Sequence, residues 1–300
     1  MSHPFPRRFE RRQFISTLCG AGIAAAALGQ QPKPSYKGEN IQYGLVTYMW
    51  GADLDLPTLI ETCDKAGIQG VELRVEHAHK VDPTLTGPQR DGVRKRFEDA
   101  QVKLIGMGTN FEFHAADPDA VKKNIASAKE YVKLSHDIGG SGVKVKPNAL
   151  PKEVAKEKTL DQIGRSLAEL ADYALGFGQE IRLEVHGGVT ELEDIRTIMQ
   201  VAKRDGVRVC WNCNDADLHG EGIEANFAKV KDYLGHTLHM RPGDPKYPYK
   251  TLAKLLVEAD FDGYTCLEAH TKIEGDRVEA LIAQRELWMG MIKEARLAAA

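Results

Sequence analysis

Short apolar runs alternate with longer amphipathic stretches along most of the chain, and this alternation restricts the fold more than any other sequence feature. Within Leu160–Phe177, for example, Leu160, Ile163, Leu167 and Leu170 recur at helical spacing. Strands that alternate with helices imply a parallel sheet. Eight runs are predicted to form strands: Tyr43–Tyr48, Gly70–Leu73, Val102–Met107, Gly142–Val145, Ile181–Val185, Val207–Trp211, Thr237–Met240 and Tyr264–Leu267.

Eight parallel strands are enough to close a (β/α)8 TIM barrel, and a chain of 300 residues has the usual length of one such domain. A doubly wound open sheet is the alternative. That fold usually has a glycine-rich turn after its first strand, whereas the turn here reads Tyr48-Met49-Trp50-Gly51-Ala52. We therefore predict a single barrel domain over residues 41–295. Four glycines are expected to end helices before the next strand: Gly67, Gly178, Gly206 and Gly263.

The first 29 residues are predicted to form a twin-arginine signal peptide. Glu10-Arg11-Arg12-Gln13-Phe14-Ile15 resembles the twin-arginine export signature, and Ala25-Ala26-Ala27 offers a cleavage site. The apolar stretch Ile15–Leu28 is too short and too small-sided for a good membrane span. An amphipathic helix with chance arginines is the alternative. Residues 30–40 read as a linker, and we expect a periplasmic protein with no stable membrane span once the signal is removed.

Charge and cysteine content exclude two classes of function. The formal net charge is -3, and the first thirty residues contribute +3, so the remaining chain carries about -6. Such an acidic body argues against a nucleic acid partner, which requires clustered Lys and Arg. Cys210 and Cys213 form a lone C-x-x-C without the second pair that a structural zinc site needs, so we expect both to pack in the core. Whether the chain forms a homo-oligomer stays open.

Four consecutive strand ends carry side chains that are suited to binding a metal. In a TIM barrel the active site is built at the carboxyl ends of the strands, which converge on one point. Glu184, Asn212, His239 and Glu268 lie at the ends of the fifth to eighth predicted strands. Each alone has a plainer interpretation, such as an ion pair of Glu184 with Arg182 or a core histidine. Together they predict one divalent ion, for which carboxylate and imidazole ligands suit Mn, Mg, Co or Zn.

Six segments together carry a resemblance to one known family. They resemble the xylose-isomerase-like barrels known as sugar phosphate isomerase/epimerase, and the resemblance runs from Tyr43 to about Trp288. In that family Glu, Asp, His and Glu at strands five to eight hold the metal. The departure here is Asn212 in place of Asp, which leaves Asn214 or Asp215 as alternative ligands. The segments are Gly44–Gly51, Val71–Arg74, Gly142–Asn148, Glu184–Gly187, Cys210–Asn212 and Leu267–Glu268.

The resemblance implies an isomerase or epimerase that acts on a small-molecule sugar through an enediolate. It implies that Glu184 and Glu268 both hold the metal and move the proton. Lys144 is a candidate second electrophile, whereas Lys146 is expected to turn away and to be either solvated or paired with a loop. Trp50 and Trp211 are candidates for an apolar wall against the sugar ring. The side chains expected to bind substrate are Glu72, Arg74, His77, His79, Lys144, His186 and Arg241.

Three other functions fit the same pattern less well. A metal-dependent lyase or hydrolase of keto-sugars or keto-glycosides would use the same enolate chemistry with a leaving group. An endonuclease-like barrel would need several metals and a basic groove, which the acidic body disfavours. A sugar-binding relative without catalysis would have Asn212 as its lesion.

Overall fold

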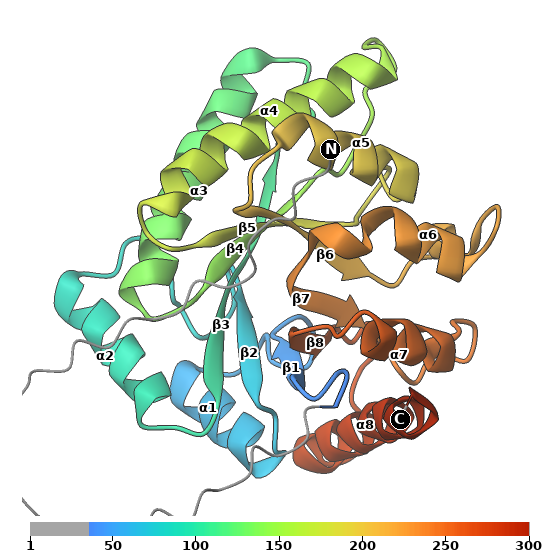
Figure 1. The fold of residues 1–300 in the computed structure, drawn as a ribbon. Helices are drawn as coiled ribbons and strands as arrows, with labels where there is room; N and C mark the ends of the chain where they lie inside the picture. Colours follow the sequence, from blue (N-terminus) through green and yellow to red (C-terminus); the bar gives the residue numbers. More distant parts are fainter. Residues whose placement is uncertain (1–35, 300) are drawn as a thin grey trace, which may run out of the picture. The chain divides into compact units, whose positions relative to one another are not determined.

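The computed structural model describes residues 36–299, so the predicted signal peptide lies outside the described part of the chain. Eight parallel strands, β1 to β8, follow one another around a closed barrel in sequence order, and β1 pairs with β8 (Figure 1). This confirms the predicted TIM barrel. The strands are β1 Ile41–Val46, β2 Gly70–Arg74, β3 Lys103–Glu112, β4 Gly142–Lys146, β5 Glu180–Glu184, β6 Val207–Asn212, β7 Leu234–Met240 and β8 Gly263–Leu267.

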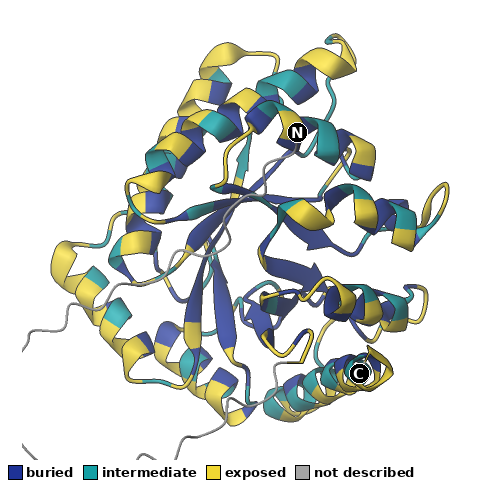
Figure 2. Ribbon diagram, in the orientation of Figure 1, coloured by how far each residue is buried: buried dark blue, intermediate teal, exposed yellow. Residues whose placement is uncertain are grey.

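A helix follows each strand and packs on the outside of the barrel. In Figure 2 the strands are almost entirely buried, while the helices are buried toward the strands and exposed on their outer face. The described residues contain no helix that is long and apolar enough to cross a membrane. The helices are α1 Leu56–Lys65, α2 Gly87–Glu98, α3 Pro118–Asp137, α4 Lys156–Leu175, α5 Leu192–Ala202, α6 Ile223–Val230, α7 Tyr249–Glu258 and α8 Arg277–Ala299, with short 3-10 helices η1 Asp215–Leu218 and η2 Lys231–Tyr233.

The helical pattern read from the sequence corresponds to the buried face of α4. Leu160, Ile163, Leu167 and Leu170 are all buried there, as the spacing predicted. The cysteines of the lone C-x-x-C are likewise buried and free, together with Cys63 and Cys266. The buried residues of α4 belong to the main hydrophobic core, whereas Cys266 lies in a smaller buried cluster with Val46 and Ile105.

Only two of the four predicted helix-ending glycines have the left-handed conformation. Gly67 and Gly178 have φ of 66° and 63°. The prediction is wrong for Gly206 and Gly263, because Lys203 itself takes the left-handed position at the end of α5 with φ 47°, and Gly263 already begins β8. At the end of α5 a lysine therefore adopts the strained left-handed backbone conformation in which the sequence rule expects a glycine.

Candidate active site at the carboxyl end of the barrel

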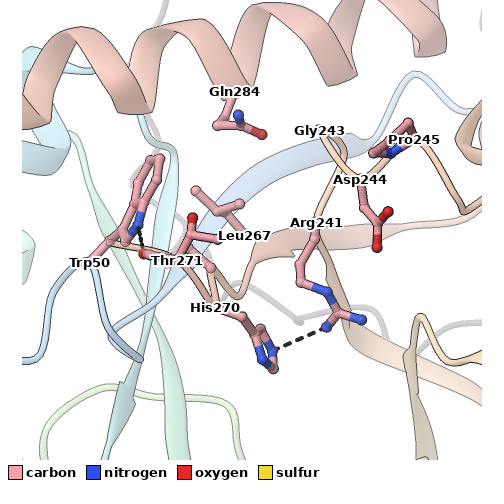
Figure 3. A pocket seen from close by; sticks show the side chains of 10 residues that line it. Trp50, Arg241, Gly243, Asp244, Pro245, Leu267, His270, Thr271 and Gln284 are labelled. Atoms are coloured by element: carbon pink, nitrogen blue, oxygen red, sulfur yellow. Dashed lines mark hydrogen bonds between the residues drawn. The ribbon is translucent and has the colours of Figure 1, made fainter. Parts of the chain in front are cut away.

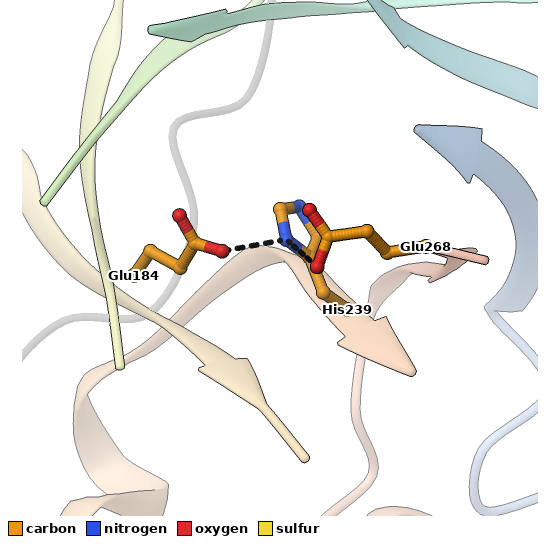
Figure 4. A group of neighbouring side chains, drawn as sticks. All are labelled: Glu184, His239 and Glu268. Carbon is orange, nitrogen blue, oxygen red and sulfur yellow. Dashed lines mark hydrogen bonds and ion pairs between the residues drawn. The ribbon is translucent and has the colours of Figure 1, made fainter. Parts of the chain in front are cut away.

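Two carboxylates and one imidazole meet inside the barrel near the ends of three strands. Glu184 ends β5, His239 lies in β7 and Glu268 directly follows β8, and their ligand atoms all lie within 4.8 Å of one another. His239 Nδ1 is 3.3 Å from Glu184 Oε1 and 3.8 Å from Glu268 Oε2 (Figure 4). All three side chains are buried. One nitrogen of the ring therefore faces both carboxylates.

Asn212 is the residue of β6 that lies beside this group. Its Nδ2 donates to Glu184 Oε1 over 3.1 Å, while its buried Oδ1 has no hydrogen-bond partner among the described residues. The two alternatives lie farther along the chain: Asn214 donates to the Val185 carbonyl over 2.8 Å, and the side chain of Asp215 is exposed. Asn212 is thus the strand-six side chain that faces Glu184.

Glu72 lies behind His239 and is not among the residues that line the pocket at the strand ends. It is fully buried in β2, and its Oε1 is 3.2 Å from His239 Nε2, the ring nitrogen that points away from Glu184 and Glu268. We had expected Glu72 to contact the sugar. Its contact with the far ring nitrogen of His239 instead fixes the orientation of that ring and favours the tautomer protonated at Nε2.

Lys144, on β4, is also buried and contacts Glu184. Its Nζ is 2.6 Å from Glu184 Oε2 and donates to the Thr109 carbonyl over 3.1 Å, and the side chain is fully buried. Burial raises the pKa of Glu184, but the Lys144 ammonium and the His239 ring outweigh burial and hold that pKa well below its usual range. The alternative interpretation of Glu184, an ion pair with Arg182, is not what the structure shows, because Arg182 pairs with Glu180 over 3.0 Å.

The buried group as a whole carries a surplus of negative charge. Burial lowers the pKa of His239, but Cys210, Glu72 and Glu184 around the ring outweigh burial and raise that pKa well above its usual value. The group contains the three carboxylates of Glu72, Glu184 and Glu268, and the one Lys or Arg side chain that forms an ion pair with any of them is Lys144, which contacts Glu184. Such a group is costly to bury unless a further cation balances it.

A pocket of about 420 Å³ opens above this group. Of the side chains expected to bind substrate, Arg74, His186 and Arg241 line it. Lys146 lines it too and is only 8% exposed, so the expectation that it turns away is wrong. Proline after Lys146 does not redirect the side chain, because β4 stays regular through that residue. The full lining is Tyr48, Arg74, Lys146, His186, Gly187, Asn212, Asn214, Arg241, Glu268 and His270.

His186 is held in place by the end of the neighbouring strand. Its Nδ1 is 2.9 Å from Asn148 Oδ1, and the Gly188 N–H donates to the Asn148 carbonyl over 2.7 Å. Gly187 has φ 72°, and a Cβ there would come within 2.3 Å of the same carbonyl, so this position requires glycine. The Glu184–Gly187 segment therefore places Glu184 beside His239 and Glu268, and places His186 in the pocket.

Two predicted substrate contacts, His77 and His79, do not line the pocket. His77 Nδ1 is 2.9 Å from Thr47 Oγ1, and burial together with Arg74 lowers its pKa to about 4. His79 Nε2 is 2.7 Å from the Arg74 carbonyl, and its Nδ1 accepts from the Val81 N–H over 3.0 Å. These histidines stabilise the loop that follows β2. Their effect on the pocket is to fix the backbone of Arg74.

A second cavity of about 400 Å³ adjoins the pocket and shares Arg241 and His270 with it. Arg241 Nη1 is 3.1 Å from His270 Nε2 (Figure 3), and both side chains line both spaces. Trp50 lines the second cavity and donates to the Thr271 carbonyl over 2.7 Å. Trp211, the other predicted apolar wall, is instead a core residue that donates to the Tyr247 hydroxyl over 3.2 Å.

Tyr48 and His270 are pocket residues that we had not singled out as substrate contacts. Tyr48 lies two residues past the end of β1 and His270 three past the end of β8, and this closeness to a strand end is the signal that could have identified them. Their rings pack edge to face with centroids 5.3 Å apart, so β1 and β8 together close this side of the pocket.

Sequence comparison assigns the chain to a family. Residues 60–289 match the sequence profile of the xylose isomerase-like TIM barrel. The chain belongs to this family. A curated relative, the inosose isomerase of Bacillus velezensis, is 22% identical over 170 residues, which cover 55% of this chain and 60% of that protein. The match therefore spans less than two thirds of that relative's length.

Several solved structures share the architecture of the family. L-Ribulose 3-epimerase superposes with a TM-score of 0.74 at 14% identity, covering 86% of this chain and 97% of that one. The IolI protein with a bound zinc atom gives 0.73 at 17% identity, over 85% and 99% of the two chains. The 3-keto-D-glucoside 4-epimerase YcjR from E. coli gives 0.69 at 13% identity, over 84% and 99%. At these identities the likeness shows the shared fold.

Proposed function

We propose that this chain is a divalent-metal-dependent isomerase or epimerase of a sugar or sugar derivative. The observation that carries the proposal is the buried cluster of Glu184, His239 and Glu268 beneath the pocket. The fold is that of solved sugar epimerases, and the curated relative is an inosose isomerase. In this proposal Glu184, His239, Glu268 and Asn212 hold the ion.

The described residues fit a metal ion on two independent grounds. The Asn212 Oδ1 is buried without a partner, so it has a free lone pair beside Glu184. The surplus of negative charge among Glu72, Glu184 and Glu268 would be neutralised by one divalent cation, with Lys144 supplying the third positive charge. Oxygen and imidazole donors suit Mn, Mg, Co or Zn, and the similar IolI structure holds zinc.

The two glutamates differ in their access to substrate. A bound divalent ion would polarise the sugar carbonyl and acidify the neighbouring C–H bond. Glu268 lines the pocket, and His270 and His239 outweigh its burial and keep its pKa below the usual value, so it is ionised and ready to accept a proton. Glu184 lies deeper, with Oε2 held by Lys144. We assign the proton transfers to Glu268 and Glu184, with Glu268 nearer to substrate.

The proposal is tested by metal content and proton exchange. Purified protein should hold about one divalent ion per chain, and Glu268→Gln should lose most of it. The metal-loaded protein, incubated with a panel of ketoses and keto-glycosides in deuterated water, should incorporate deuterium next to the carbonyl, as seen by NMR. Full metal retention in both Glu184→Gln and Glu268→Gln would refute the ligand assignment.

A lyase or hydrolase of keto-glycosides is the second candidate. The cavity beside the pocket favours it, because the space lined by Trp50 and Leu267 gives a leaving group somewhere to lie. One similar structure is a 3-keto-D-glucoside 4-epimerase. The same NMR experiment separates the two reactions, since a lyase or hydrolase releases the substituent whereas an epimerase leaves the glycoside intact.

A further inference from the structure

Three permanent cations line the pocket from three sides of the barrel. Arg74 ends β2, Lys146 ends β4 and Arg241 follows β7. None of the three forms an ion pair with a carboxylate of the described residues, although the same chain pairs many of its other basic side chains. The pocket thus has a basic rim above an acidic floor.

Of the three cations, Lys146 is the most informative about the ligand because its side chain is buried. Three Lys and Arg side chains of the described residues are less than 9% exposed, and the other two are paired: Lys144 with Glu184 and Arg182 with Glu180. Lys146 has neither a hydrogen bond nor an ion pair through its Nζ among the described residues. Burial and the nearby Lys144 ammonium lower the pKa of Lys146, and together they outweigh the opposing effect of Glu184 and Glu268.

The two arginines are fixed by neutral groups. Arg74 Nη2 donates to Asn110 Oδ1 over 2.9 Å, its Nε is buried without a partner, and its guanidinium lies 4.9 Å from the centre of the Tyr48 ring. Arg241 Nη2 donates to the Cys213 carbonyl over 2.7 Å. These contacts orient both guanidinium groups without neutralising them, as binding sites for planar anions commonly do.

The acidic side of the pocket does not offset these charges. Glu268 is the one carboxylate among the lining residues, and it faces His239 and His270 at 3.8 Å and 3.7 Å. In the proposed function it also holds the metal. Three cations therefore remain for whatever enters the pocket.

We propose that the sugar bound here carries an anionic group, a carboxylate or a phosphate, which Lys146, Arg74 and Arg241 hold. That the ligand is a sugar rests on the proposed function, whereas its negative charge is inferred from the basic side chains of the pocket. A neutral sugar would cover the Lys146 ammonium without supplying it with a counter-charge. An anionic one satisfies the buried amine and both fixed guanidinium groups at once.

The test compares three probes with one carbon skeleton: D-fructose, its 6-carboxylate D-fructuronate and D-fructose 6-phosphate. Affinities are measured by calorimetry on the metal-loaded protein, on Lys146→Met and on Lys146→Arg. We expect at least one anionic probe to bind roughly 10-fold or more tightly than D-fructose. Lys146→Met should remove most of that preference, and Lys146→Arg should restore part of it. Which anion binds better identifies the carboxylate or the phosphate.

Matched controls keep the outcome clear. Lys122→Met removes an exposed lysine of α3 that pairs with Asp119, and it should change no affinity. Arg241→Gln is a second rim variant in case Lys146→Met is unstable, and it should weaken the anionic probes selectively. Measurements after removal of the metal show whether the probe binds the rim or only the ion.

The proposal is overturned if neither anion binds better than D-fructose, or if Lys146→Met weakens all three probes equally, because the cations then serve a step common to every sugar. Binding that vanishes with the metal and ignores Lys146→Met overturns it as well. A failure of the proposed function looks different: no probe exchanges deuterium, yet the anions still bind in a Lys146-dependent way.

Discussion

Asn212 is a neutral amide beside two carboxylates in a place where the family resemblance leads one to expect an acid. Its amide nitrogen donates to Glu184 while its oxygen is left free. An aspartate at this position would add a negative charge on one side of Glu184, while the positive charge of Lys144 lies on the other side. A single residue thus tunes the charge of the whole buried group.

Asn212→Asp is expected to tighten metal binding by roughly 1–3 kcal/mol, because it adds an anionic oxygen next to Glu184. Turnover should stay equal or fall, since a more neutralised ion polarises a carbonyl less. Metal titration and steady-state rates of the two proteins check this. Unchanged affinity in Asn212→Asp, with a large loss in Asp215→Asn, would show that the strand-six ligand is Asp215.

Glu72→Gln is expected to lower metal affinity by roughly 10- to 100-fold without touching the metal. The reason is that the carboxylate beside Nε2 favours the tautomer of His239 whose Nδ1 lone pair faces Glu184 and Glu268. Competition with a fluorescent chelator measures the affinity. Glu180→Gln is the control: it breaks the pair with Arg182 in β5 and should lower stability but not metal affinity.

At the scale of elements, η1 holds a titratable group in an unusual state. Asp217 is buried there, accepts from the Tyr247 hydroxyl over 2.5 Å and from the Asn214 N–H over 3.0 Å, and burial raises its pKa to about 7. This short helix follows β6 directly and so supports the loop that contains Asn214.

Asp217→Asn should stabilise the fold increasingly as the pH rises. Between about pH 4 and 7 the carboxyl is protonated in the folded chain and ionised in the unfolded chain, so its contribution to stability falls through that range. Each pKa unit corresponds to about 1.4 kcal/mol, so the gain over wild type should reach a few kcal/mol above pH 7. Urea unfolding of both proteins at pH 5 and pH 8 measures it. An equal difference at the two pH values would contradict the buried-acid interpretation.

The order and type of the elements could be predicted from the sequence, because apolar periodicity follows directly from burial. The depth at which each side chain lies within the barrel could not be predicted. Glu72 lies two residues before Arg74, and Lys144 two before Lys146, so the members of each pair share a face of the strand. The structure shows the first of each pair among buried groups and the second in the pocket. Only the packing of all eight strands decides which layer meets solvent.

The directions of the loops that follow the strands could not be predicted from the sequence either. His77 lies three residues past the end of β2, as His270 lies past the end of β8. The chain nevertheless turns at Glu76, with φ 66°, so that the His77 ring contacts Thr47 and the His79 ring contacts the Arg74 carbonyl. A left-handed residue that is not glycine leaves little trace in the sequence. The substrate contacts taken from these loops were accordingly the least reliable of the predictions.

For the whole molecule, export remains a prediction from the sequence, since residues 1–29 lie outside the described part. Replacing Arg11 and Arg12 by Lys should retain the protein in the cytoplasm of its host, because the motif requires the arginine pair. Fractionation with immunoblotting checks this. Arg7 and Arg8 lie before the motif, so the same replacement there is the matched control and should leave export unchanged.

An acidic floor beneath a basic rim has a thermodynamic consequence: occupancy of one level changes the affinity of the other. A cation bound among Glu184, His239 and Glu268 cancels the repulsion that those carboxylates exert on an anion above them. Metal and anionic sugar should then bind with positive cooperativity, and linkage requires that each tightens the other by the same factor. A protein of this kind captures its metal most firmly when substrate is abundant.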